Sequence, residues 1–266
     1  MTRVLSGAAL VVIAVAVVWF ASPLVFLVAS LALLGLAFVE YVSLARAVGI
    51  DLPAWPAGVG VAATAGALSK TMTGGVPPAA LEVVLMSAGV AIAALVLPRW
   101  RGGRDALSLS AASLLPLLYL GLPVGALIAV REARGPQGLF LLMLTVMVSD
   151  TAQYYTGRLF GRTPLAPAIS PKKTIEGAAG GFVFGMLLLG VVGRWWLPGV
   201  SWPLRTLLGA AIVALGIAGD LFESMLKRSA GVKDSSTLIP GHGGVLDRID
   251  ALLFAAPIYY VVLKYV

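Results

Sequence analysis

The sequence predicts an all-α polytopic membrane protein with about nine transmembrane helices. Two observations come from composition: 59% of the 266 residues are hydrophobic and only 12% are charged, with a mean hydropathy of +0.98. An ordinary soluble domain has about 25% charged residues, so this composition excludes an ordinary water-soluble globular protein. The third observation is that the apolar residues form long runs, and a bilayer requires about 20 such residues per helix.

The candidate spans follow one another along the whole chain, separated by short segments rich in Pro, Gly and charge. The first could be read as a signal peptide, but a second apolar run follows almost at once, so we expect it to remain as an anchor. The third is short and rich in Gly and Ala. The predicted spans are 4–20, 24–39, 56–69, 79–97, 107–130, 138–157, 175–193, 205–226 and 245–265.

Nine spans place the two termini on opposite sides of the membrane, and the Lys and Arg residues indicate which side is which. Cytoplasmic loops carry an excess of these cations. With nine spans, 13 of the 19 fall on the face of the N-terminus, which we therefore expect in the cytoplasm. These 13 are Arg3, Arg46, Arg99, Arg101, Arg104, Arg158, Arg162, Lys172, Lys173, Lys227, Arg228, Lys233 and Arg248. No organelle-specific signal is visible, so we expect a bacterial inner membrane.

Charge and cysteine content exclude several functions. The net charge is +7, but the cations are dispersed one to three at a time, so no nucleic acid partner is expected. Such an excess suits the anionic headgroups of membrane lipids. With no Cys, the chain has no disulfide, no Cys metal site and no thiol nucleophile.

The chain divides into two regions of one integral membrane domain. Residues 1–135 are mostly Ala, Val, Leu and Gly, which predicts a scaffold of transmembrane helices. Residues 136–266 contain seven of the 12 acidic residues, several of them at span ends. Acids there are costly unless paired or bound to metal, so we expect this C-terminal region to be catalytic.

A polar stripe ends the eighth span. Asp220, Glu223, Ser224 and Lys227 are spaced by three, four and seven residues, so they share one helix face. Taken alone, the stripe fits either a ladder of ion pairs or part of a functional site.

The following segment, residues 233–250, favours a site. Its glycines at 241, 243 and 244 let the backbone approach a ligand and offer N–H groups to phosphate oxygens. Asp247 and Asp250 lie one turn apart, and their hard oxygens suit Mg²⁺, which also binds substrate phosphates. A glycine-rich loop alone would be weak support, but its combination with paired acids and Arg248 is strong.

A third polar patch joins the sixth and seventh spans. Asp150 lies near the cytoplasmic end of the sixth span, on one face with other polar residues. Residues 170–174 bring two cations and two hydroxyls to the start of the next helix, whose N–H groups favour an anion. The four-residue spacing of Gly177, Gly181 and Gly185 predicts close helix packing.

Together these segments resemble the phosphatidate cytidylyltransferase family, also called CDP-diacylglycerol synthases. The long signature matches position by position, and residues 170–174 with Glu176-Gly177 are similar to a second family block. The signature reads Ser224-x-x-Lys227-Arg228-x4-Lys233-Asp234, then Pro240-x-His242-Gly243-Gly244-x-x-Asp247-Arg248-x-Asp250. Ile175 stands where the family commonly has Trp, and Ala152-Gln153 where many members have small residues. These departures leave the preferred lipid open.

The resemblance implies that CTP and phosphatidate react to give CDP-diacylglycerol and pyrophosphate. A phosphate monoester has a second pKa of about 6, so the lipid phosphate is a nucleophile without a general base. The difficulty is repulsion between two anionic substrates, which one or two Mg²⁺ ions and fixed cations would offset; the donor set also allows a monovalent ion. We expect metal ligation by Asp220, Asp247 and Asp250, and catalytic roles for Asp220, Asp247, Lys227 and Arg248.

The remaining expected residues bind substrate. Asp150 could bind metal or the cytosine amine, and His242 is expected to donate a hydrogen bond to phosphate. The substrate-binding set is Asp150, Ser170, Lys172, Lys173, Thr174, Ser224, Arg228, Lys233, His242, Gly243 and Gly244, with Ser236 and Thr237 as further donors. Expected partners are CTP, phosphatidate and membrane lipids, and a homodimer is left open.

Two alternatives remain. A cytidylyltransferase for another lipid phosphate, such as an isoprenoid glycerol phosphate, would use much the same residues. A secondary transporter also carries intramembrane acids and broken spans, but it would require polar groups near the midplane and two related halves.

Overall fold

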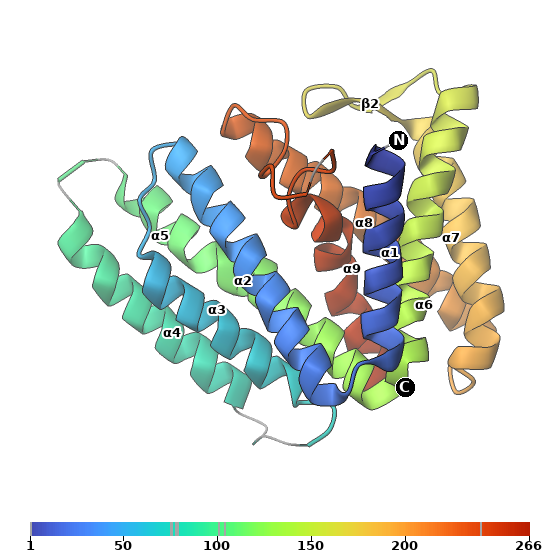
Figure 1. Cartoon of the computed structure of the whole chain (residues 1–266), viewed down its shortest axis with the longest axis horizontal. Helices are drawn as coiled ribbons and strands as arrows, with labels where there is room; N and C mark the ends of the chain where they lie inside the picture. Colours follow the sequence, from blue (N-terminus) through green and yellow to red (C-terminus); the bar gives the residue numbers. More distant parts are fainter. Residues whose placement is uncertain (1, 75–76, 78–79, 101, 104, 240) are drawn as a thin grey trace.

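The computed structural model describes residues 2–74, 77, 80–100, 102–103, 105–239 and 241–266, and the side chains from residue 7 onward. Arg101, Arg104, Pro240 and the side chain of Arg3 therefore lie outside the described residues. Within them, nine α-helices form one bundle with a small hairpin at one end (Figure 1). The helices are α1 (Thr2–Phe20), α2 (Pro23–Ala47), α3 (Ala54–Ser69), α4 (Ala80–Val96), α5 (Ala106–Pro116), α6 (Leu122–Phe160), α7 (Ile175–Trp196), α8 (Trp202–Ser229) and α9 (Leu246–Tyr265).

Each of the nine predicted segments coincides with helical structure, but the fifth and sixth are organised differently from the prediction. The predicted span 107–130 consists of α5, a π-helical turn η2 (Leu117–Gly121) and the first part of α6. Pro116 lies at this junction, and proline cannot donate an intrahelical hydrogen bond. Helix α6 is broken at Gly135, which has a φ of 71° and is followed in the chain by Pro136. Beyond this break, α6 continues as the sixth predicted span.

The protein is an all-α membrane protein. Five helical stretches among the described residues are long and apolar enough to cross a membrane: Pro23–Ala47, Ala80–Arg99, Ala106–Phe160, Ile175–Trp196 and Trp202–Ser229. The third of these, with 55 residues, contains both the fifth and the sixth predicted span. A total of nine spans and a cytoplasmic N-terminus remain predictions.

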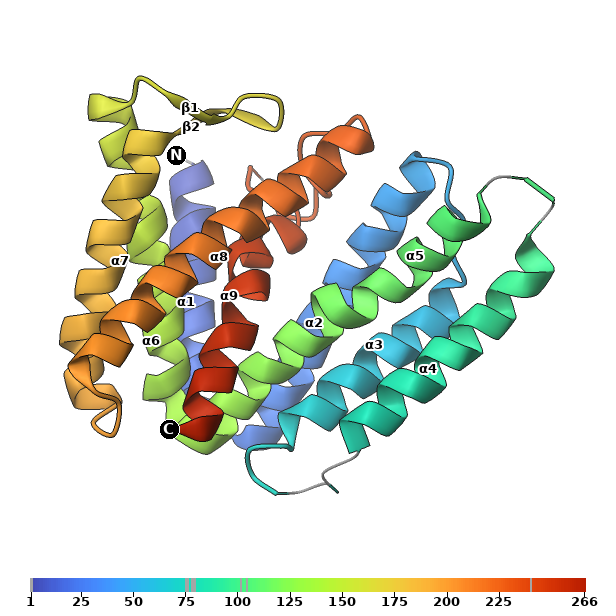
Figure 2. The same cartoon turned by 180° about the vertical axis from the view of Figure 1, so that it is seen from behind.

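The chain termini lie at opposite ends of the bundle (Figure 1). The N-terminal end of α1, the hairpin and the loop between α8 and α9 share one end, and Figure 2 shows the same arrangement from behind. An odd number of spans requires this separation of the termini.

Close packing of α7 depends on glycine, as the spacing predicted. A Cβ atom on Gly177 would lie 2.8 Å from the carbonyl oxygen of Gln153 in α6, and one on Gly181 would lie 2.5 Å from the Gln153 Cγ. Gly185 instead faces Val213 of α8. The absence of side chains therefore lets α7 approach both α6 and α8, which confirms the prediction of close helix packing.

A two-stranded hairpin precedes α7. Strand β1 (Pro164–Ala166) pairs antiparallel with β2 (Ser170–Thr174), which runs directly into the helix. Thr174 caps that helix, since its hydroxyl accepts the N–H of Gly177 at 3.1 Å. Glu176 closes the base of the hairpin by accepting the N–H groups of Arg162 and Thr163 at 3.1 and 3.2 Å. The predicted anion-binding segment is thus a strand that projects from the end of the bundle.

Candidate functional site

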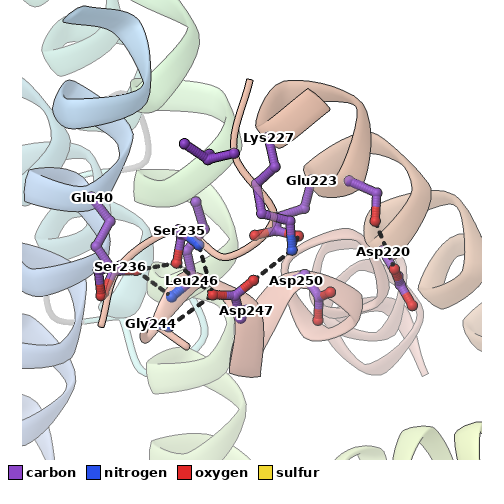
Figure 3. A network of polar contacts seen from close by, with 12 residues as sticks. Glu40, Asp220, Glu223, Lys227, Ser235, Ser236, Gly244, Leu246, Asp247 and Asp250 are labelled. Carbon is purple, nitrogen blue, oxygen red and sulfur yellow. Dashed lines mark hydrogen bonds and ion pairs between the residues drawn. The ribbon is translucent and has the colours of Figure 1, made fainter. Parts of the chain in front are cut away.

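Polar residues from both halves of the chain meet where α8 ends and α9 begins (Figure 3). They form two groups. The α9 cluster consists of Glu40, Glu223, Lys227, Ser235, Ser236, Gly244 and Asp247. The α6 cluster consists of Asp150, Gln153, Lys173, Asp220 and Ser224.

Asp247, in the first turn of α9, is the centre of the α9 cluster. Its Oδ2 accepts the N–H of Ser235 at 2.9 Å, the hydroxyl of the same residue at 2.7 Å, and the N–H of Gly244 at 2.8 Å. Its Oδ1 accepts Lys227 Nζ at 2.5 Å. With only 5% of the side chain exposed, this carboxylate is largely occupied by donors of the chain itself.

Lys227 joins α8 to α9. Its ammonium forms ion pairs with Asp247 and with Glu223, one helical turn before it in α8. The Glu223 side chain is fully buried, and among the described residues Lys227 is the cation that pairs with it. A buried charge needs a partner, so Lys227 is held between two acids from different helices.

Glu40 of α2 is the residue that sequence reasoning missed. It is 5% exposed and accepts four hydrogen bonds: from the hydroxyls of Ser235 and Ser236 at 2.8 and 2.7 Å, and from the N–H groups of Val245 and Leu246 at 2.9 and 2.8 Å. The available signal was a lone acid directly after the apolar run 24–39, where an acid is costly unless paired.

The α6 cluster is more open. Asp220 of α8 pairs with Lys173 of β2 at 2.5 Å, and their side chains are 35% and 23% exposed. Ser224 donates to Asp220 at 3.3 Å, and Gln153 donates to Asp150 of α6 at 3.0 Å. Asp150 interacts electrostatically with both Lys173 and Asp220. Three separate elements therefore bring their charges together here.

Asp250 connects the two clusters. Its carboxylate is close enough to Asp220 and Asp150 to be repelled by their like charge, and close enough to Lys227 to be attracted by it. In the view of Figure 3 it lies between Asp247 and Asp220. The three predicted metal ligands thus occupy neighbouring positions on α8 and α9.

A pocket of about 390 Å³ opens on the loop between α8 and α9. It gathers seven residues to which the sequence analysis gave a catalytic, substrate-binding or phosphate-binding role: Lys233, Ser236, Thr237, Gly241, His242, Gly243 and Arg248. The lining also includes one acid, Asp234, but two cations and two hydroxyls outnumber it, and this chemistry suits an anion. The pocket lies near α1, because a Cβ atom on Gly7 would be 3.0 Å from His242 Nε2.

Other predicted residues have different surroundings. Lys172 is exposed, and exposed Arg228 donates to the Val232 carbonyl oxygen at 3.0 Å. Ser170 begins β2, at the distal end of the hairpin from the Thr174 cap. The N–H of Gly244 points to Asp247, and a Cβ atom there would collide with Glu40 and Ser235. The close approach that this glycine permits is therefore to carboxylates of the chain.

The expected magnesium site can be tested against these donors. Among the described residues, no group of three or more Asp, Glu or His side chains is close enough to hold a metal ion. The donor chemistry fits, because carboxylate oxygens are preferred Mg²⁺ ligands and Asp220 is one-third exposed with a single ion pair. Metal binding by Asp220, Asp247 and Asp250 remains a prediction.

The fold and these clusters define a helical membrane protein with a candidate site for anionic ligands at one end of its bundle. The chain belongs to the cytidylyltransferase family, whose family model matches residues 1–266. This finding confirms the resemblance noted in the sequence.

Named relatives extend the comparison. The chain is 49% identical to a phosphatidate cytidylyltransferase of Synechocystis over 134 residues, which cover 48% of this chain and 45% of that protein. It is 39% identical to one of Aquifex aeolicus over 147 residues, covering 55% and 54%. It is 40% identical to one of Thermotoga maritima over 160 residues, covering 58% and 59%. The chain thus matches about half the length of these relatives.

Proposed function

We propose that the chain transfers a cytidylyl group from CTP to phosphatidate. An oxygen of the lipid phosphate forms a bond to the α-phosphorus of CTP, the bond from that phosphorus to the β-phosphate oxygen breaks, and pyrophosphate leaves. The observation that carries the proposal is the gathering of Lys233, His242 and Arg248 in one pocket, whose Gly243 lies against Asp247. Family membership and the names of the relatives support the choice of CTP and phosphatidate.

The cations of the site answer the repulsion between the two substrates. Lys233 and Arg248 would neutralise phosphate oxygens in the pocket, where fixed charges cost no reorganisation during the reaction. Exposed Lys172 and Arg228 would draw anionic substrates to this end of the bundle. The lipid phosphate is already a nucleophile near neutral pH, so no side chain is assigned as general base.

Mg²⁺, held by Asp220 with Asp247 and Asp250, would supply further neutralisation of the triphosphate. Asp220 is suited to exchange its ammonium partner for another cation because it is partly exposed. Asp250 would add an oxygen from the next turn of α9, and Asp150 would hold the cytosine amine or a cation. Ser224, which donates to Asp220, would orient that carboxylate.

The proposal includes an orientation in the membrane. Nine spans with a cytoplasmic N-terminus, in a bacterial inner membrane, would expose the site to cytoplasmic CTP while lipid enters from the leaflet. The site shares its end of the bundle with the N-terminus, which supports this arrangement (Figure 1). A reporter enzyme fused after Val266 is expected on the outer side, and a cytoplasmic reporter would contradict the odd span count.

The decisive test is incubation of purified protein with labelled CTP and phosphatidate. CDP-diacylglycerol and pyrophosphate should form in equal amounts, stop with EDTA and resume with Mg²⁺. Arg248→Gln should lose activity, while Arg194→Gln, at the exposed end of α7, serves as the matched control. Absence of CDP-diacylglycerol at every Mg²⁺ concentration would contradict the proposal.

A second lipid substrate has one observation in its favour. Gln153, which departs from the common family pattern, donates to Asp150 within the α6 cluster and therefore changes the site itself. A panel containing phosphatidate and an isoprenoid glycerol phosphate would distinguish the two lipids. We expect phosphatidate to be preferred, because that is the substrate in the names of the relatives.

A further inference from the structure

Glu40 lies in the half of the chain that the sequence assigned to a scaffold, yet it is directed at the signature loop (Figure 3). Nearly 200 residues separate it from Ser235 and Ser236 in sequence. It is 5% exposed, and among the described residues no Lys or Arg forms an ion pair with it. A buried carboxylate without a cation is costly, so its hydrogen bonds must compensate for the lost water.

Both carboxylate oxygens of Glu40 are fully used. Oε1 accepts the Ser236 hydroxyl and the N–H of Val245, while Oε2 accepts the Ser235 hydroxyl and the N–H of Leu246. The two N–H groups belong to the start of α9, where the helix has unpaired donors and a partial positive charge. Glu40 therefore caps α9 from another helix and binds the preceding loop at the same time.

This arrangement connects Glu40 to Asp247. Leu246, whose N–H is bound to Glu40, directly precedes Asp247 in the chain. The Ser235 hydroxyl lies 2.8 Å from Glu40 and 2.7 Å from Asp247, so it links the two carboxylates. Gly244 fits beside them only because it has no side chain, since a Cβ atom would overlap both Glu40 and Ser235. Loss of the Glu40 contacts would release the loop and the first turn of α9 together.

We propose that Glu40 is a positioning residue of the transfer site, which fixes the signature loop and thereby the carboxylate of Asp247. The inference rests on the proposed function for its consequence in catalysis, but its structural part stands independently. Glu40 itself contacts no substrate, and its influence passes through Ser235, Ser236 and the start of α9. The N-terminal half is then part of the site and not only its support.

Glu40→Gln tests this with almost no change of shape. An amide replaces one acceptor oxygen by an NH₂ group, so in either orientation one backbone N–H and one hydroxyl lose their acceptor. The hydroxyl can rotate away, but the backbone N–H cannot. We expect kcat/KM to fall by about 10- to 100-fold, the range for residues that orient active-site ligands. Glu82→Gln, at an exposed acid of α4, should be indistinguishable from the parent protein.

A spectroscopic readout separates positioning from a general loss of stability. The chain has no cysteine, so Leu238→Cys, at a loop position that is 54% exposed, provides a unique site for a spin label. The label should be immobilised with Glu40 present and become mobile in the Glu40→Gln background. Ser235→Ala removes the hydroxyl that links Glu40 to Asp247 and leaves the hydrogen bond of the labelled residue to Ser236 in place, so it should give a smaller gain in mobility. This variant decides the question if the Glu40→Gln protein does not accumulate.

The outcomes are distinct. Unchanged label mobility in the Glu40→Gln protein, or in the Ser235→Ala protein if only that one accumulates, would overturn the inference, as would parental kcat and KM in Glu40→Gln. An unsubstituted protein that makes no CDP-diacylglycerol would overturn the proposed function, while the label would still decide whether Glu40 holds the loop.

Discussion

The α9 cluster and the α6 cluster both contain an aspartate of α8 or α9, but the two carboxylates differ in exposure and in the number of hydrogen bonds they accept. Asp247 in the first has 5% of its side chain exposed and accepts four hydrogen bonds from the chain. Asp220 in the second has 35% of its side chain exposed, with one ion pair and one hydrogen bond of 3.3 Å. Both side chains pair with a lysine from a different element.

This difference separates two tasks within one site. A carboxylate whose oxygens are all occupied fixes the geometry of its neighbours, and removing it leaves several buried donors unpaired. A partly exposed carboxylate with one ionic partner can exchange that partner for a ligand at smaller cost. We therefore expect the α9 cluster to determine shape as well as activity, and the α6 cluster to determine activity alone.

Asp247→Asn should have the largest effect. The variant is expected to fold and insert but to lose turnover by about 10³-fold at any Mg²⁺ concentration, because fixed charge at the reacting groups is lost. Its free energy of unfolding should also fall by about 3 kcal/mol, since among the described residues Lys227 keeps only Glu223 as an ion-pair partner. Steady-state rates over a Mg²⁺ series and thermal unfolding in detergent measure the two effects.

Asp51→Asn provides the matched control for this variant. Asp51 is 83% exposed and lies 3.7 Å from Arg46, so the same chemical change should alter neither measurement. Parental activity of Asp247→Asn would exclude Asp247 from metal binding and remove the centre of the α9 cluster.

Asp220→Asn should reduce activity by about 10²-fold and leave thermal unfolding unchanged. The amide retains an oxygen for the Ser224 hydroxyl and loses the ion pair, which contributes little to stability at a partly exposed position. Higher Mg²⁺ should restore part of the activity if the carboxylate binds metal. If Asp220→Asn lowers the unfolding temperature as much as Asp247→Asn does, the α6 cluster also determines shape, and the proposed difference between the two clusters is wrong.

The helices could be predicted because hydropathy and run length alone determine where they form. The break of α6 at Gly135-Pro136 falls in the predicted gap between spans 107–130 and 138–157. The π-helical turn after Pro116 lies inside a predicted span, where hydropathy does not distinguish it from an α-helix. The hairpin at residues 164–174 was missed because its two short strands alternate weakly and are closed by a side chain from α7, Glu176.

The site was predictable wherever its residues share a segment. Lys233, His242 and Arg248 follow one another in the signature, and the structure brings them into one pocket. Glu40 could not be assigned, because its partners are nearly 200 residues away and only the packing of α2 against the α8–α9 loop brings them together. The capping role of Thr174 could not be predicted either, because the sequence alone does not distinguish a threonine that binds phosphate from one that accepts a helix N–H.

The smallest expected effect compares two adjacent lysines. Lys173 is partly buried and pairs with Asp220, whereas Lys172 is exposed on the same strand. Lys173→Gln should raise the KM for CTP by about tenfold, because a charge-assisted contact within the site is lost. Lys172→Gln should raise it by about twofold, and this effect should vanish at high ionic strength because exposed charges are screened. Initial rates at low and high salt would measure both effects on KM. If the two substitutions have equal effects that vanish at high salt, Lys173 acts only as a distant surface charge, and the α6 cluster is not organised around Asp220.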